Sequence, residues 1–223
     1  MSSARREVKR RGRRILSLAA RPTYARSLSF VMGRDELPHV LNSRGLLGTG
    51  AEVGVKLGEY SEELLRTWRG RRLISIDSWP VATGADPGDP VVGEAAQERY
   101  LAETRRRLAP FGERSEIRRQ DSLEAAAEID PGELDFVYID AAHEYDAVRA
   151  DIDAWHSRVR PGGLLCGHDY YDGFRAGAMY GVARAVDEFC DAHGLRVHTT
   201  LREHPEKSWF VPIPEPGAGN GAG

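Results

Sequence analysis

The segment Leu134-Asp-Phe-Val-Tyr-Ile-Asp-Ala-Ala-His-Glu-Tyr145 begins with an apolar run and continues into polar residues, among them Asp140 and His143. An apolar run of this length is typical of a buried parallel strand, and ligands bind beyond the carboxyl ends of such strands. We therefore expect Asp140 and His143 to face a cleft, where a carboxylate and an imidazole can anchor a cation and accept a proton. The alternative is that Asp140 caps the next helix and His143 lies at the surface, because Asp is a favoured N-cap.

Composition places the chain among ordinary globular proteins. Its 223 residues are 41% hydrophobic and 29% charged, which suits one sizeable α/β domain. No apolar run approaches the roughly 18 residues that span a bilayer, so we expect no membrane span. The two cysteines, Cys166 and Cys190, are too few for a disulfide framework and stand in apolar surroundings. This pattern favours buried, reduced thiols and a cytoplasmic protein.

The two ends of the chain differ from its body. Residues 1–26 hold nine Lys and Arg residues against Glu7 alone, a balance of +8 that leaves −11 for the rest of the total of −3. We predict that residues 1–44 form a basic, solvated N-terminal extension; contact with nucleic acid, an anionic surface or a second copy in a homo-oligomer are the alternatives. The extension lacks the apolar core of a secretory signal, so we expect no export. Residues 213–223, rich in Pro and Gly, are predicted to be a flexible tail.

Short apolar runs alternate with amphipathic segments along the body of the chain. This alternation indicates a doubly wound α/β fold with a mostly parallel sheet, which a final antiparallel hairpin can close. A turn is expected at Arg160–Gly163 and a helix C-cap at Gly194. The predicted strands are Ala51–Val55, Arg72–Ile76, Ser115–Arg119, Phe136–Ile139, Leu164–Gly167, Arg196–Leu201 and Ser208–Val211. The predicted helices are Glu62–Trp68, Glu94–Leu108, a short one from Ser122, one through Val148 and Trp155, and Gly181–Cys190.

A glycine motif, Glu52-Val-Gly-Val-Lys-Leu-Gly-Glu-Tyr-Ser61, follows the first predicted strand. Gly54 and Gly58 allow the backbone to approach a ligand closely, and Ser61 is placed to cap the next helix or to donate a hydrogen bond. The three-glycine fingerprint of dinucleotide-binding folds is absent, and Glu59 and Glu62 put negative charge where a pyrophosphate would sit. The motif therefore favours an uncharged or cationic ligand.

Acidic residues end the second and third predicted strands. Asp77 stands roughly twenty residues beyond the glycine turn, where an acid can accept both ribose hydroxyls of a nucleoside. Asp121 and Ser122 are placed to contact an adenine edge. Helix capping is the alternative role for each Asp.

Two loops are candidate walls of a ligand site. The loop Ser78–Gly93 contains Trp79, and the loop Tyr170–Tyr180 combines aromatic residues with glycines, as a lid would. Loops of this kind usually determine ligand choice. We name Trp79, Tyr145, Tyr170 and Tyr171 as candidate substrate residues; an ordinary surface loop is the alternative for the second segment.

These residues together resemble the class I S-adenosylmethionine-dependent methyltransferases. The glycine motif Glu52–Gly58, Asp77, the pair Asp121-Ser122 and the turn Pro161-Gly-Gly163 carry the resemblance over residues 45–212. The segments Tyr138–Tyr145, Gly162–Tyr170 and Gly181–Phe189 look like a branch of small-molecule O-methyltransferases, related to the sugar O-methyltransferases of macrolide biosynthesis and distantly to the catechol O-methyltransferases. The resemblance implies a Rossmann-like seven-stranded sheet with a reversed last strand. It implies S-adenosylmethionine as cofactor, bound by Glu52, Gly54, Gly58, Ser61, Asp77, Ser78, Asp121, Ser122 and Asp140.

The resemblance also concerns catalysis. Asp140 and Asp169 match the positions that hold Mg²⁺ in metal-dependent members, and we name His168 with them as the third candidate metal ligand. His143 matches the position of a general base that is lysine in the catechol-type enzymes, and histidine suits that role because its reference pKa is about 6.5. The low number of oxygen ligands leaves a metal-free site, or a softer divalent cation than Mg²⁺, as alternatives.

The function implied is methyl transfer to a hydroxyl of a small molecule, a sugar or natural product, with His143 and Asp140 as catalytic residues. Three other classes remain open: a nucleic-acid methyltransferase that uses the basic arm, a nicotinamide-dependent oxidoreductase, and a non-catalytic nucleoside-binding module. The acidic body opposes binding of nucleic-acid phosphates. The sequence does not identify the acceptor.

Overall fold

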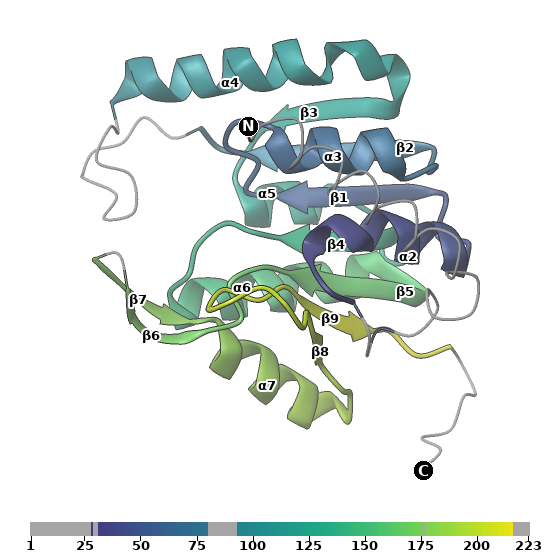
Figure 1. The fold of residues 1–223 in the computed structure, drawn as a ribbon, viewed down its shortest axis with the longest axis vertical. Helices are drawn as coiled ribbons and strands as arrows, with labels where there is room; N and C mark the ends of the chain where they lie inside the picture. Colours follow the sequence, from purple (N-terminus) through teal and green to yellow (C-terminus); the bar gives the residue numbers. More distant parts are fainter. Residues whose placement is uncertain (1–27, 29–30, 80–92, 176, 216–223) are drawn as a thin grey trace, which may run out of the picture.

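The computed structural model describes Leu28 and residues 31–79, 93–175 and 177–215. Their main feature is a seven-stranded sheet of order β3-β2-β1-β4-β5-β9-β8 (Figure 1). The first five strands in the chain are parallel, β9 is antiparallel to β5, and β8 is antiparallel to β9. The predicted fold class is therefore confirmed. The strands are β1 (Thr49–Val53), β2 (Arg72–Asp77), β3 (Ser115–Arg119), β4 (Leu134–Ile139), β5 (Val159–Gly167), β8 (His198–Thr199) and β9 (Trp209–Pro212).

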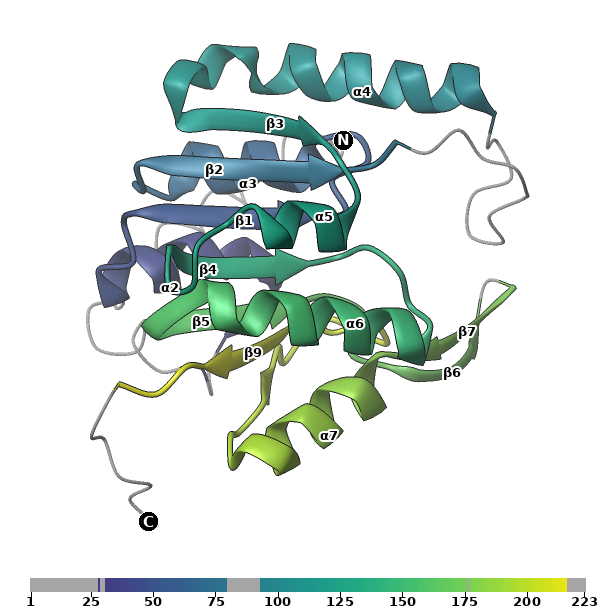
Figure 2. The same ribbon diagram turned by 180° about the vertical axis from the view of Figure 1, so that it is seen from behind.

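Helices cover both faces of the sheet. On one face lie α2 (Leu37–Arg44), α3 (Glu59–Thr67) and α4 (Glu94–Leu108), toward the viewer in Figure 1. The opposite face carries α5 (Ser122–Ala127), α6 (Tyr145–Trp155) and α7 (Val182–His193), which are in front in Figure 2. Short 3-10 turns, η3 (Arg34–Glu36), η4 (Ala109–Arg114) and η5 (His156–Arg158), complete the connections. None of the helices in the described ranges has the length and apolar character that crossing a membrane requires.

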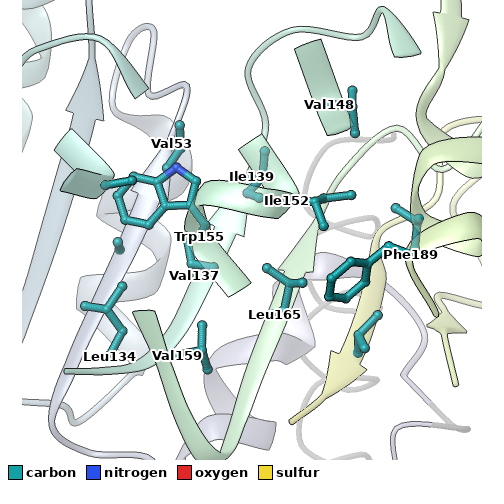
Figure 3. Packing of buried hydrophobic residues seen from close by; sticks show 14 of the residues in the cluster. Val53, Leu134, Val137, Ile139, Val148, Ile152, Trp155, Val159, Leu165 and Phe189 are labelled. Carbon is teal, nitrogen blue, oxygen red and sulfur yellow. The ribbon is translucent and has the colours of Figure 1, made fainter. Parts of the chain in front are cut away.

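The apolar runs form the buried layers between sheet and helices. Every residue of β4 is buried, because helices cover both of its faces. Trp155 and Ile152 of α6 and Phe189 of α7 pack on one face of the sheet (Figure 3). Burial of a side chain of this size contributes about 1.5–3 kcal/mol, so this layer fixes the strand ends that form the site. Cys166 and Cys190 are free and buried, as predicted.

Residues 31–44 pack into the main body although we placed them in the N-terminal extension. Leu37, Val40 and Leu41 are buried in the same cluster as Trp68 and Phe136. Packing therefore continues across the predicted boundary at residue 45. The strongly basic residues 1–26 lie outside the described residues.

Two local predictions were wrong. The segment Tyr170–Tyr180 is not an irregular loop: β6 (Asp172–Arg175) and β7 (Ala178–Gly181) form an antiparallel hairpin, and Gly177, at φ +87°, supplies the left-handed backbone that the turn needs. The expected turn at Arg160–Gly163 is a bulge within β5, since Leu134 pairs with Val159 but Phe136 with Leu164. A Cβ at Gly163 would lie 2.5 Å from the carbonyl oxygen of Asp135, so glycine permits this close approach.

The beginning of the predicted flexible tail is hydrogen-bonded to the sheet. The amide of Ile213 donates to the carbonyl oxygen of Gly163, and the carbonyl oxygen of Ile213 accepts from the amide of Gly162. The rest of the tail, from residue 216, and residues 80–92 of the predicted loop Ser78–Gly93 lie outside the described residues.

Candidate active site

A cavity of about 730 Å³ opens at the carboxyl ends of β1, β2, β3 and β4. This is the location expected for a ligand in a doubly wound sheet. Most of the predicted cofactor residues line it, namely Glu52, Gly54, Asp77, Ser78, Asp121, Ser122 and Asp140, and His143 joins them. The structure therefore brings these predicted residues from four strand ends together in one cavity.

Gly54 joins the ends of β1 and β4. Its backbone has φ +89°, and a Cβ there would lie 2.0 Å from the carbonyl oxygen of Asp140. The amide of Asp140 donates to the carbonyl oxygen of Val53 at 2.7 Å. Only glycine allows the chain after β1 to approach the backbone of Asp140 this closely. Gly58 has φ +72° and is the N-cap of α3, so the second glycine starts the helix.

Glu52 is a buried acid beneath the glycine turn, 1% exposed. The hydroxyl of Ser61 donates to its Oε2 and lies 2.8 Å from the hydroxyl of Ser75. Burial raises the pKa of Glu52 to about 8, although the hydrogen bond from Ser61 opposes this rise. Ser61 lies within α3, so the hydrogen-bonding alternative for Ser61 is correct and the capping alternative is wrong.

Asp77 and Asp121 line the cavity while holding local backbone. One carboxylate oxygen of Asp77 accepts from the amide of Lys56 and the other from the amide of Trp79, each at 2.8 Å. Asp121 caps α5 by accepting from the amides of Leu123 and Glu124. The capping alternative therefore holds for Asp121, and its position in the cavity wall still allows contact with a ligand.

Ser122 lines the cavity, and two side chains of α6 hold its hydroxyl. Its hydroxyl donates to Asp151 Oδ1 and accepts from the indole nitrogen of Trp155 at 2.9 Å. Burial raises the pKa of Asp151, and the hydrogen bond from Ser122 opposes this rise. The adenine contact predicted for Ser122 would have to use its backbone or share this hydroxyl.

Asp140, His143 and Asp169 form a cluster at the end of β4. One potential ligand atom from each residue lies within 4.8 Å of the others. His143 Nε2 is 2.9 Å from Asp169 Oδ2, and His168 Nδ1 is 3.2 Å from Asp169 Oδ1. The predicted metal ligands include His168, but in the structure His143 completes the compact group with the two aspartates. His168 instead supports Asp169 from the other side, with its Nδ1 3.9 Å from Asp140 Oδ1.

The charges of this cluster are coupled. Burial lowers the pKa of His143, but the hydrogen bond and charge of Asp169 outweigh it and raise the pKa above its ordinary value. Burial alone would raise the pKa of Asp169, yet hydrogen bonds from His143 and His168 hold it well below its usual range. For Asp140, burial raises the pKa, and the positive charges of His168 and Arg34 oppose that rise. Asp169 is thus a fixed anion that orients the imidazole of His143.

The predicted substrate residues are less well placed. Trp79 is fully buried against Val55 and Leu101, with its indole nitrogen donating to the carbonyl oxygen of Lys56. The hydroxyl of Tyr145 donates to Glu188 and that of Tyr170 to Asp187, both on α7. Tyr171 lies edge-on to Tyr180, with ring centroids 5.9 Å apart. These four side chains thus support the walls of the site, with Trp79 fully buried, and their contact with a substrate stays a prediction.

Tyr180 and Arg34 line the cavity and were not among the site residues predicted from the sequence. Tyr180 of β7 stacks on the His143 imidazole, with ring centroids 4.4 Å apart and planes 19° apart. Arg34 approaches from η3 and makes an ion pair of 3.4 Å with Asp140. Tyr180 stood in a segment already named as a wall, but no motif marked Arg34, because its position depends on tertiary contacts with distant residues.

Comparison with solved structures supports the fold. An O-methyltransferase from Bacillus cereus in complex with S-adenosylhomocysteine (SAH) has a TM-score of 0.54 and 17% identity, over 80% of this chain and 79% of that chain. A candidate caffeoyl-CoA O-methyltransferase from Staphylococcus aureus has a TM-score of 0.57 and 14% identity, over 80% and 81% of the two chains. An O-methyltransferase family protein from Burkholderia thailandensis has a TM-score of 0.57 and 12% identity, over 82% of this chain and 60% of that chain. At these identities the likeness concerns the fold alone.

The sequence itself identifies the family. No curated protein matches the chain. A family model described as a methyltransferase domain matches residues 51–170, which are 120 of the 223 residues and run from the glycine motif to the end of the Asp140–Asp169 cluster. The chain belongs to this family of methyltransferase domains, and the prediction of a class I S-adenosylmethionine-dependent methyltransferase is confirmed.

Proposed function

We propose that the protein transfers a methyl group from S-adenosylmethionine to a hydroxyl group of a small molecule, with His143 as the general base. The observation that carries this proposal is the His143–Asp169 pair, because its His143 lines the same cavity as Glu52, Gly54 and Asp77. A base and the predicted cofactor residues are thus brought to one place, as methyl transfer to a hydroxyl requires.

The charge of the cavity wall supports a cationic cofactor. Six carboxyl groups line it, against the cations Arg34 and Lys56, and the six are Glu52, Glu59, Asp77, Asp121, Asp140 and Asp151. S-adenosylmethionine carries a sulfonium and an ammonium group, which such a wall attracts. The pyrophosphate of a nicotinamide cofactor and the phosphates of a nucleic acid would both be repelled.

Individual residues fit parts of this cofactor. Asp77 is assigned to the ribose hydroxyls, and Asp121 and Ser122 to the adenine. Gly54 lines the cavity, and its lack of a Cβ lets the backbone of Asp140 and Ala141 pack directly against it. When bound, S-adenosylmethionine supplies an activated methyl group.

The residues of the cluster have simple tasks in this proposal. A neutral His143 donates Nε2–H to Asp169, which leaves Nδ1 to accept the proton of the acceptor hydroxyl. The ionised Asp169 stabilises the imidazolium that forms. Tyr180 packs on the imidazole and limits its rotation. Positioning of donor and acceptor would supply much of the remaining acceleration.

The same cluster also favours a second role, that of a divalent-cation site. Asp140 and Asp169 offer carboxylate oxygens and His143 a nitrogen, a donor set that suits Mn²⁺, Fe²⁺ or Zn²⁺ better than Mg²⁺. A bound cation would acidify the acceptor hydroxyl. His143 Nε2 would then be a ligand, so the two roles predict opposite effects of chelation.

Calorimetric titration with S-adenosylhomocysteine (SAH), the demethylated cofactor, tests the donor assignment. We expect micromolar binding to the wild-type protein and a loss of at least about tenfold in Asp77→Ala, because a charged hydrogen bond to the ribose is removed. Absence of binding to the wild-type protein would overturn the proposal.

The acceptor is sought by incubating the enzyme with S-adenosylmethionine and a panel of sugars, phenols and hydroxylated natural products, and measuring methylated products by mass spectrometry. Each reaction is repeated with EDTA and with added Mn²⁺ or Mg²⁺. Turnover that survives EDTA supports His143 as base, whereas turnover that requires Mn²⁺ supports the cation role. Methylation of RNA or DNA instead of any panel member would contradict a small-molecule acceptor.

A further inference from the structure

Arg34 is held at the cavity by a segment remote in the sequence. The amides of Leu201 and Arg202 donate to the carbonyl oxygens of Val31 and Met32, at 3.0 and 2.9 Å. The amide of Arg34 then donates to Glu203 Oε1 at 2.8 Å. These bonds tie the residues before η3 to the connection between β8 and β9, so Arg34 has a fixed backbone position.

Glu203 is well suited to hold this backbone. Its Oε2 accepts from the hydroxyl of Thr200 at 2.7 Å and from the amide of Ser208 at 3.1 Å. Although burial raises its pKa, the hydrogen bonds from Arg34, Thr200 and Ser208 lower it below the ordinary value, so the carboxylate is ionised. An ionised acceptor bound at both oxygens fixes the amide of Arg34 firmly.

The side chain of Arg34 keeps its charge available to the cavity. Its guanidinium lies over the ring of Tyr60, 4.9 Å from the ring centroid, and the hydroxyl of Tyr60 donates to the Arg34 carbonyl oxygen. The ion pair with Asp140 is long, at 3.4 Å, and the Arg34 side chain remains 37% exposed. A guanidinium has five N–H donors in a planar fork, a geometry that matches a second carboxylate.

The order of the strands indicates which part of the cofactor would reach Arg34. The cavity runs from β3 and β2, where Asp121 and Asp77 are assigned to adenine and ribose, toward β1 and β4. An adenosine placed in this way directs the amino-acid tail toward Arg34, Glu52 and Asp140. That tail is a zwitterion, and these residues offer one cation and two acids for its carboxylate and ammonium groups.

We propose that Arg34 binds the α-carboxylate of the cofactor's amino-acid tail, exchanging its ion pair with Asp140 for this ligand, and that Glu203 is the positioning residue that holds Arg34 in place. The inference rests on the proposed function, because it assumes S-adenosylmethionine as the donor. It assigns roles to Arg34 and Glu203, and neither residue belongs to the glycine motif or to the acids at the strand ends.

The experiment compares calorimetric binding of two ligands, SAH and 5′-methylthioadenosine, which lacks the amino-acid tail. In the full chain, Arg34→Gln is expected to weaken SAH binding about 10- to 100-fold and to leave methylthioadenosine binding unchanged. Arg34→Lys, which keeps the charge but loses the fork, should fall between wild type and Arg34→Gln. Arg72→Gln is the matched control, since this arginine pairs with Glu116 and Glu133 at the opposite end of β2.

Glu203 is tested in the same assay. Glu203→Ala should weaken SAH about 2- to 10-fold without affecting methylthioadenosine, and Glu203→Gln, which keeps an acceptor oxygen, should restore affinity. Thermal unfolding of each variant identifies those that fail to fold. If Arg34→Gln does not fold, the affinities of Arg34→Lys for SAH and methylthioadenosine test the inference instead. The inference is overturned if Arg34→Gln binds SAH as tightly as wild type, or loses both ligands equally. Failure of wild type to bind either ligand would instead refute the proposed function.

Discussion

His143 Nε2 lies 2.9 Å from Asp169 Oδ2, and this contact joins the end of β4 to the end of β5. The second oxygen of Asp169 is 3.2 Å from His168 Nδ1, so one carboxylate orients two imidazoles. The pair resembles in its geometry the histidine and carboxylate of a hydrolase triad, in which the acid fixes the tautomer of the base. It gives His143 a defined nitrogen, Nδ1, for accepting a proton.

Replacement of His143 by Gln should lower kcat by about 10²- to 10⁴-fold, the usual contribution of a general base. The affinity for SAH should stay within about twofold, because the imidazole is assigned to the acceptor side of the cavity. Rates are measured with an acceptor found in the panel above. His156→Gln, a histidine at the far end of α6 that contacts Phe189, is the control and should retain the wild-type rate. Unchanged turnover in His143→Gln would remove the base assignment.

Replacement of Gly54 by Ala should disrupt the close contact between the backbone after β1 and the backbone after β4. The added Cβ would lie 2.0 Å from the carbonyl oxygen of Asp140 at a φ of +89°, so both contact and backbone strain oppose it. We expect a loss of more than about 3 kcal/mol in the free energy of unfolding, or loss of SAH binding if the strands separate locally.

Gly45→Ala provides the matched control for Gly54→Ala. Gly45 also has positive φ, at +72°, but a Cβ there meets nothing within 4 Å. Its replacement should cost only about 1 kcal/mol, the price of the left-handed backbone alone. Urea unfolding measures both free energies, and equal losses at the two positions would contradict the role given to the Asp140 contact.

The sequence predicts those parts of the fold that depend on local pattern. The run ending at Ile139 marks β4 because a strand buried on both faces needs apolar residues throughout, and polar residues directly after it fall at the ligand edge. Asp140 and His143 were found in this way. The hairpin of β6 and β7 was missed because Gly177 was interpreted as a sign of a loop, whereas it supplies a tight turn between two strands.

Residues that act through tertiary contacts could not be found from local pattern. Arg34 is placed at the cavity by the bond of its amide to Glu203 and by the bonds of the preceding Val31 and Met32 to Leu201 and Arg202. Nothing in its neighbourhood in the sequence indicates this distant pairing. Trp79 stands two residues after Asp77 in the sequence, but its side chain packs in a buried cluster with Val55 and Leu101. The choice between His143 and His168 as the partner of the two aspartates likewise depends on side-chain direction.

Glu52 should make SAH binding depend on pH. Burial raises its pKa to about 8, so the acid is mainly neutral in the free protein at pH 7. A nearby ammonium group favours the ionised form, and SAH affinity should therefore rise by up to about tenfold per pH unit from pH 6 toward 8 and level off above it. Calorimetry between pH 6 and 9 measures this slope. A Glu52→Gln protein should lose it, and a slope that persists in that variant would assign the effect to another group.

The same pKa has a consequence for the stability of the free protein. Because the folded-state pKa of Glu52 is raised from 4.5 to about 8, the folded state binds a proton that the unfolded state has released. Its contribution to stability is complete below about pH 4.5 and is lost as the pH rises through about 8. Thermal unfolding of wild type and Glu52→Gln should therefore differ increasingly over this range. Parallel curves for the two proteins would contradict the raised pKa.

Ser122→Ala should test whether this residue acts chiefly in structure. Its hydroxyl is shared by Asp151 and Trp155, which are 5% and 0% exposed, and its removal leaves both without this partner. We expect a loss of about 2–3 kcal/mol in the free energy of unfolding, with SAH affinity changed by less than about threefold. Ser115→Ala is the control, because among the described residues the buried Ser115 hydroxyl has no hydrogen-bond partner and its removal should cost little. Should Ser122→Ala instead keep its stability and lose SAH binding, the hydroxyl would belong to the adenine site, as the sequence first indicated.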